Sequence, residues 1–291
     1  MRYYRLPADA DSRLIASDGQ NAYDLSTARA SLRSFGDLAS VATIVDTDID
    51  EITDRLVQDA AVVDPETVST EAKLPVIPNE VWAAGVTYEI SSDAREQESG
   101  RPDIYQDVYE NERPELFFKA TSSRTVGPGN SVGIRTDSEW NVPEPELAVV
   151  IYRGTIVGYT VGNDVSSRSL EGKNPLYLPQ AKVYNKCCAL GPCIASTGSI
   201  SDPHELDMSM TIERDGTRVF DDTTSTSKMV RTCEELTSYL TRCNAVAELT
   251  VLLTGTCLVP PDEFTLQDGD RIVIDVENIG TLTNVVETVR K

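Results

Sequence analysis

Short apolar runs dominate the second half of the chain and define most of the elements that we expect. ELAVVI (146–151) and TIVGYTVGND (155–164) flank Arg153-Gly154, which indicates a β-hairpin. Asp215-Gly216, inside SMTIERDGTRVFDD, predicts a second hairpin, and ELTVLLTGTCLVP and DRIVIDVENIGTLTNVVE add β-rich runs near the C-terminus. The pattern predicts an α+β fold that is mainly β.

A capping motif and helical spacing predict one helix. Thr232-x-x-Glu235 has the pattern of a capping box, and Leu236, Leu240 and Cys243 follow at helical spacing. By contrast, GPGNSVG (127–133) lacks the spacing of a phosphate-binding loop, and we expect a hairpin turn there.

The chain divides near residue 72. Residues 1 to about 70 mix short strand-like and helical pieces without a chemical motif, whereas KLPVIPNEVWAAG (73–85), with two prolines, indicates the start of another unit. We predict a small N-terminal domain over 1–72 and a larger domain over 73–291. The polar stretch 89–113 is either a solvated loop or helix, or a mobile lid.

Composition narrows the class of protein. With 47 acidic and 26 basic residues, the formal net charge of −21 argues against nucleic-acid binding. We interpret the charge as adaptation to high salt, with a basic partner as the alternative. No apolar run reaches the ~18 residues of a membrane span, and MRYYRLPADADSR has no apolar signal region. We therefore expect a cytoplasmic protein.

The soft metal ligands do not form a zinc motif. Cys187, Cys188 and Cys193 lack CxxC spacing and a second ligand pair, so we expect the six cysteines to be buried, reduced thiols. The single histidine, His204, lies in the polar stretch SDPHELD and is expected at the surface.

Two carboxylates stand at the start of an apolar run in PEPELAVVI (143–151). Side chains alternate along a strand, so Glu144 and Glu146 project from one face, and the prolines indicate an edge or a strand end. Like charges so placed need a cation, a shared proton or solvent, and two exposed glutamates are the alternative.

Asp164 ends the next apolar run and strengthens the metal interpretation. If the two runs form a hairpin, Asp164 folds back toward Glu144. Three converging carboxylates describe a site for a hard cation, Mg²⁺ or Mn²⁺.

Only seven of the 26 basic residues are lysines, and two of them lie in apolar surroundings. Lys119 lies in ELFFKA and Lys182 in LPQAKVYNK. A buried lysine can pair with a carboxylate or act as a base, and a side chain that reaches to solvent is the alternative.

PEPELAVVI, GYTVGNDVSSR, AKVYNKCCALGPCI, LLTGT and GDRIVIDVENIGTLTN, in this order, resemble the fumarylacetoacetate hydrolase superfamily over 73–291. The resemblance implies a mixed β-sheet catalytic domain, with Mg²⁺ (Mn²⁺ or Ca²⁺ as alternatives) on Glu144, Glu146 and Asp164. It also implies an active-site lysine at Lys182, a substrate contact at Thr256, and a dimer or tetramer.

One departure from the family pattern bears on the reaction. Hydrolases of the superfamily often carry N-Y-x-x-H-x-x-E, whose histidine and glutamate activate water. The corresponding stretch here begins at Thr87, with Ser91 and Ala94 at those two positions. Hydrolysis of a carbon–carbon bond by that pair is therefore disfavoured.

The run RPELFFKATSSRTVGPGNSVGIRTDSEWNVPEPELAVVI resembles a branch without this pair, the 2-keto-3-deoxy-pentonate dehydratases of xylose and arabinose oxidation. The resemblance implies dehydration of 2-dehydro-3-deoxy-D-arabinonate or the xylose-derived acid to 2,5-dioxopentanoate. Lys182 and Glu115 are then the candidates for proton transfer, and Lys119 and Thr256 for substrate binding. An acylpyruvate hydrolase, an oxaloacetate decarboxylase and a non-catalytic binding protein are the alternatives.

Overall fold

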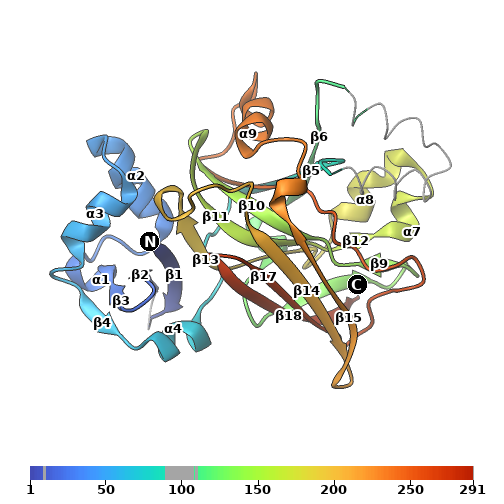
Figure 1. The fold of residues 1–291 in the computed structure, drawn as a ribbon, viewed down its shortest axis with the longest axis horizontal. Coiled ribbons are helices and arrows are strands. Elements are labelled where there is room, and N and C mark those ends of the chain that lie inside the picture. Colours follow the sequence, from blue (N-terminus) through green and yellow to red (C-terminus); the bar gives the residue numbers. More distant parts are fainter. Residues whose placement is uncertain (9–10, 89–107, 109–110, 291) are drawn as a thin grey trace.

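Two β-sheets build most of the fold, and short helices surround them (Figure 1). The computed structural model describes residues 1–8, 11–88, 108 and 111–290. Strands predominate over helices, so the prediction of an α+β, mainly β fold is confirmed.

The large sheet has the order β4 (Ala61–Val63), β3 (Ala22–Asp24), β2 (Ser12–Ser17), β1 (Arg2–Pro7), β13 (Cys188–Ser196), β11 (Thr155–Asp164), β10 (Pro145–Tyr152), β16 (Leu249–Leu253), β5 (Glu80–Gly85) and β6 (Glu115–Ala120), with β7 (Thr125–Val126) beside β13. The smaller sheet has the order β15 (Thr217–Ser225), β14 (Asp207–Arg214), β17 (Arg271–Val276), β18 (Gly280–Val289) and β8 (Ser131–Arg135). A further pair joins β9 (Asn141–Val142) and β12 (Ser166–Ser167).

The described helices are short. They are α1 (Leu25–Ala28), α2 (Phe35–Val45), α3 (Ile49–Leu56), α4 (Pro65–Glu71), α7 (Arg168–Glu171), α8 (Leu178–Lys182) and α9 (Cys233–Thr241), with 3-10 turns at Ser122–Arg124, Pro175–Tyr177, Thr197–Ser199 and Thr226–Lys228. Among the described residues, no helix is long and apolar enough to cross a lipid bilayer.

Strand β10 is covered on both faces, which explains its unbroken apolar run. Leu147 and Val149 belong to the core between the two sheets, whereas Ala148 and Val150 belong to the core on the opposite face, beneath α2. A strand with no solvent face has no need for alternating polar residues. β10 therefore forms a rigid support for the residues at its beginning.

The N-terminal segment (blue in Figure 1) continues the large sheet, because β1 pairs with β13. Leu38 of α2 lies in the same core as Val150 of β10. The division into a small N-terminal domain over 1–72 and a larger domain over 73–291 stays a prediction.

Both predicted hairpins are confirmed, as β10–β11 and β14–β15. The hairpin predicted at 127–133 is wrong: β7 pairs with β13 of the large sheet, and β8 pairs with β18 of the small one. This turn carries the chain between sheets. The helix predicted after Thr232 is confirmed, and the Thr232 hydroxyl accepts the N–H of Glu235 at 3.0 Å.

The cysteines are free thiols, as expected, and four of them are buried: Cys187, Cys188, Cys193 and Cys233. Cys243 is exposed and Cys257 is partly exposed, so the prediction of burial is wrong for these two. Cys243 lies just beyond the C-terminus of α9, and Cys257 lies in the segment after β16. His204 is partly exposed, and its Nε2 accepts the N–H of Cys233 at the start of α9 at 3.0 Å.

Burial on both faces of β10 predicts that Val149→Ala and Val150→Ala each lower the free energy of unfolding by about 2 kcal/mol, since each removes two buried methyl groups. Denaturant unfolding in molar salt measures this. The matched control is Val62→Ala on β4, where 71% of the side chain is exposed and almost no change is expected. A loss at only one of the two β10 positions would contradict the two-core arrangement.

Candidate metal and active site

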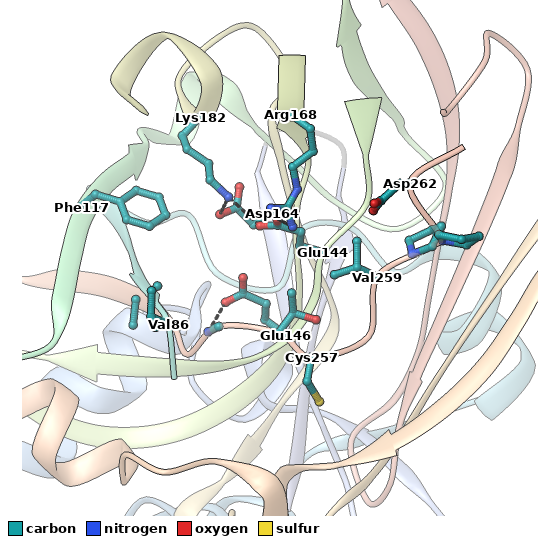
Figure 2. Close-up of a pocket in the computed structure, with 16 residues that line it drawn as sticks. Val86, Phe117, Glu144, Glu146, Asp164, Arg168, Lys182, Cys257, Val259 and Asp262 are labelled. Carbon is teal, nitrogen blue, oxygen red and sulfur yellow. Dashed lines mark hydrogen bonds and ion pairs between the residues drawn. The ribbon is translucent and has the colours of Figure 1, made fainter. Parts of the chain in front are cut away.

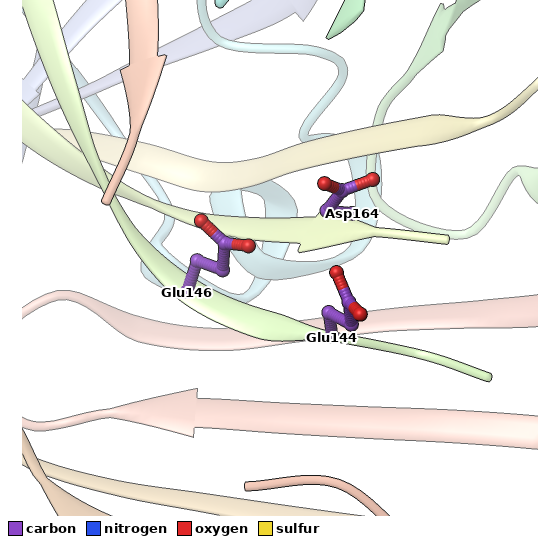
Figure 3. Close-up of side chains that lie close together, drawn as sticks. All are labelled: Glu144, Glu146 and Asp164. Atoms are coloured by element: carbon purple, nitrogen blue, oxygen red, sulfur yellow. The ribbon is translucent and has the colours of Figure 1, made fainter. Parts of the chain in front are cut away.

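Strand register brings the three predicted metal ligands together. Glu146 pairs with Gly162 of β11, and two residues further on the N–H of Asp164 donates to the carbonyl oxygen of Glu144 at 2.9 Å. Residues opposite one another on paired strands share a face. Glu144, Glu146 and Asp164 therefore point to the same side, with carboxylate oxygens within 4.8 Å of one another (Figure 3).

These carboxylates are buried, with exposed fractions of 2% or less, so the alternative of two exposed glutamates is excluded. Burial, followed by the charges of Asp164 and Glu144, raises the pKa of Glu146 well above its usual value. The N–H of Gly255 opposes this shift by donating to Oε2 of Glu146 at 2.5 Å. Three buried acids in one cluster favour a bound cation.

Three cationic side chains surround the carboxylates. Lys182, at the end of α8, places Nζ 2.6 Å from Oε2 of Glu144 and 3.1 Å from Oδ2 of Asp164. Arg168, at the start of α7, places Nη2 2.8 Å from Oε1 of Glu144. Figure 2 shows both side chains pointing toward Glu144 and Asp164.

Lys119 is the third cation and supports Asp164. Its Nζ forms an ion pair with Oδ1 of Asp164 and donates to the carbonyl oxygens of Val165, at 2.9 Å, and Lys182, at 2.6 Å. Burial alone would lower the pKa of Lys119, but Asp164 and the neighbouring thiols raise it above its usual value. Lys119 is thus a charged ammonium that joins β6, α8 and the end of β11.

A cavity of about 190 Å³ opens over the carboxylates. Its polar wall includes Lys182, Arg168 and Asp262, and its apolar wall includes Phe117 and Val259 (Figure 2). The cavity thus combines a cluster of oxygen ligands with cations that can face an anionic ligand.

The other predicted site residues lie at different distances from this cavity. Thr256 lines it, and its Oγ1 accepts the N–H of Leu258 at 3.1 Å. Glu115 begins β6 opposite Gly85, which lines the cavity, and neither Glu115 nor Lys119 is among the described lining residues. Their roles stay predictions. The lid predicted at 89–113, with Ser91 and Ala94, lies almost wholly outside the described residues.

Arg168 and the N–H of Gly255 also belong to the site, and neither was predicted. Arg168 is 4% exposed, and it stands four residues after Asp164 in GYTVGNDVSSR. An arginine among small residues at a strand end was the available signal, because a buried guanidinium needs a carboxylate partner. Gly255 acts through its backbone, which leaves no such signal.

A family model described as "Fumarylacetoacetate (FAA) hydrolase C-terminal" matches residues 80–287. The chain belongs to the fumarylacetoacetate hydrolase family, which confirms the resemblance seen in the sequence. In this fold the buried carboxylates lie at the beginning of β10 and the end of β11, beneath the cavity.

Two relatives and one solved structure are similar to this chain over most or all of its length. The chain is 60% identical to the "Probable 2-keto-3-deoxyxylonate dehydratase" of Haloferax volcanii, over 99% of this chain and 100% of the relative. It is 46% identical to the "2-dehydro-3-deoxy-D-arabinonate dehydratase" of Saccharolobus solfataricus, over 75% and 74%. A solved 2-keto-3-deoxy-D-arabinonate dehydratase, complexed with magnesium and 2,5-dioxopentanoate, superposes with a TM-score of 0.85 at 35% identity over both whole chains.

Replacing one buried cation tests the support of Asp164. Lys119→Met keeps an unbranched side chain only one atom shorter but removes the ammonium, and we expect the free energy of unfolding without metal to fall by about 3 kcal/mol or more. Denaturant unfolding with chelator measures the loss. Arg153→Met is the control, because the Arg153–Glu248 pair is exposed and should contribute little. Equal effects of the two variants would contradict this role.

Proposed function

We propose that the protein is a metal-dependent dehydratase that converts 2-keto-3-deoxy pentonates, the arabinose- or xylose-derived acids, to 2,5-dioxopentanoate. The observation that carries the proposal is the cluster of Glu144, Glu146 and Asp164 beneath a small cavity. The relatives named above act, by their names, on these two acids, and one was solved with magnesium and this product.

The donor set fits a hard divalent cation. All three side chains offer carboxylate oxygens, the ligands that Mg²⁺ prefers, and no cysteine or histidine belongs to the described cluster. We propose Mg²⁺ on Glu144, Glu146 and Asp164, with Mn²⁺ or Ca²⁺ as alternatives. When bound, the metal supplies Lewis acidity, which favours enolate formation in a 2-oxo acid.

Charge balance favours an anionic substrate. Metal ligands are ionised when a metal is bound. Counted so, and with Glu171, 3.9 Å from Nη1 of Arg168, the four described buried carboxylates at the site exceed the three buried cations by one. A divalent cation reverses this to an excess of one positive charge, which the carboxylate of a 2-oxo acid neutralises. Lys182 and Arg168 line the cavity and orient this anion.

The proton transfers fall to side chains of this chain. A base removes a proton from C3, and an acid protonates the C4 hydroxyl, which leaves as water. A proton shift from C5 to C3 then gives the enol with a C4=C5 double bond, and transfer of the C5 hydroxyl proton to C4 places the aldehyde at C5. We propose Lys182 and Glu115 for these transfers, supported by Nζ of Lys182 at the cavity wall and by Glu115 opposite Gly85. Thr256 and Lys119 are proposed for substrate binding: Thr256 contacts the substrate, and Lys119 supports the anionic form of the substrate.

We also propose the conditions, the location and the assembly in which the enzyme works. A net charge of −21 supports function at high salt. We also propose a cytoplasmic location in pentose degradation and assembly into a dimer or tetramer, as the family resemblance implies.

A substrate panel tests the proposed reaction. With Mg²⁺ in molar salt, we expect 2-keto-3-deoxy-xylonate and -arabinonate to yield 2,5-dioxopentanoate. A coupling aldehyde dehydrogenase oxidises this product, and the reduction of NAD(P)⁺ measures the rate. Acylpyruvates and oxaloacetate should turn over far more slowly, since Ser91 and Ala94 replace the residues that activate water. Turnover of acylpyruvates alone would identify a hydrolase.

Removal of one carboxylate charge tests the metal site. Glu146→Gln keeps the shape of the side chain, and we expect it to lower kcat by at least about 100-fold and to weaken Mg²⁺ binding by a similar factor. The coupled assay and titration calorimetry measure the two effects. Glu248→Gln makes the same change in an exposed residue that pairs with Arg153 at the surface, and it should leave both unchanged. Full activity of Glu146→Gln, or of the chelated wild type, would exclude the proposed metal dependence.

A further inference from the structure

The peptide that joins Thr254 and Gly255 is held at both of its polar atoms. The hydroxyl of Thr87 donates to the carbonyl oxygen of Thr254 at 2.6 Å, and the N–H of Gly255 donates to Oε2 of Glu146 at 2.5 Å. Both hydrogen bonds are buried. Because a trans peptide is planar with its C=O and N–H pointing in opposite directions, the bond at one end fixes the direction of the other.

Thr87 is itself firmly placed. It is 1% exposed, and its carbonyl oxygen accepts the N–H of Val230 at 2.9 Å. The next residue, Tyr88, forms a β-bridge with Met229. The hydroxyl of Thr87 is therefore a fixed donor.

Close packing of Thr87 on Gly255 leaves the peptide little freedom. Gly255 has φ of +91°, and a Cβ at this position would lie 2.0 Å from Oγ1 of Thr87. On the other side, both the N–H and the hydroxyl of Thr254 donate to the carbonyl oxygen of Leu147, at 3.0 and 2.9 Å. The peptide is thus held between Thr87 and β10, next to Glu146.

We infer that Thr87 is a positioning residue for Glu146: its hydroxyl orients the 254–255 peptide, and the N–H of that peptide orients the carboxylate. The inference rests on the proposed function only in so far as Glu146 is a metal ligand. Groups that hydrogen-bond to a ligating carboxylate fix its orientation, and consecutive hydrogen bonds in a low-dielectric interior strengthen one another. Thr87 does not line the described cavity, so it acts through Glu146.

Three variants separate this role from simple packing. Thr87→Val keeps the shape but removes the hydroxyl, and Thr87→Ser keeps the hydroxyl. Thr250→Val is the control, because the buried Thr250 hydroxyl donates to Ala247, at 3.0 Å, and not to the 254–255 peptide. Thermal unfolding of each variant reports the general loss of stability.

The first measurement is the amide resonance of Gly255 in metal-free protein labelled with ¹⁵N-glycine. The spectrum is simple because the chain has only 17 glycines. We expect a strongly downfield, slowly exchanging signal in wild type, Thr87→Ser and Thr250→Val, and an upfield, faster-exchanging signal in Thr87→Val. The second is titration with Mg²⁺, whose affinity should fall about 10- to 100-fold in Thr87→Val alone.

The outcomes are distinct. If Thr87→Val keeps the wild-type resonance of Gly255, or if Thr250→Val shifts it equally, Thr87 does not position this peptide. If the resonance moves but Mg²⁺ affinity does not, the peptide does not position Glu146 as a ligand, and the inference is overturned. If wild type fails to bind Mg²⁺, the proposed function fails, while the resonance still decides whether Thr87 orients the peptide.

Discussion

The burial of three carboxylates on one face of a sheet is the constraint on which the site depends. Each ionised carboxylate loses its hydration on burial, which costs several kcal/mol unless partners replace the water. Lys182, Arg168 and Lys119 supply opposite charge, and the Gly255 N–H supplies a donor. These partners come from α8, α7, β6 and the turn after β16, so the need to stabilise the carboxylates fixes how these elements meet.

Burial of both faces of the sheet holds the carboxylate cluster in place, while the cavity leaves the carboxylates accessible. β10 and β11 are buried on both faces along most of their length, and they present their acids only where β10 begins and β11 ends. Pro145 is tolerated there because β16 pairs with β10 only from Ala148 onward, so no ladder bond on that side needs the missing N–H. The strand ends thus hold the carboxylates still while leaving them open to the cavity.

Charge is arranged differently inside the molecule and outside. The chain carries a net charge of −21, but the cavity wall presents Lys182 and Arg168 beside the acids. At low ionic strength such a surface repels an anionic metabolite, whereas in molar salt the Debye length of about 3 Å confines that repulsion to close range. Buried charges are screened less by salt, so the ion pairs of Lys182 and Arg168 with Glu144 persist at high ionic strength.

Local sequence signals account for the part of the site that lies within one hairpin. The strand period of two places Glu144 and Glu146 on one face, and the turn at Arg153-Gly154 brings Asp164 to the same end of the hairpin. A register shift between Val150 and Ile151 then puts Asp164 on the face of the two glutamates, and the turn residues do not specify this shift. The other contacts of the site join segments that are far apart in the chain. Gly255 lies 109 residues from Glu146 and Thr87 lies 167 from Thr254, and turn residues at 127–133 specify that the chain bends but not which strands it joins. Such pairings follow from the packing of whole sheets, where burial selects one arrangement among many that local propensity permits.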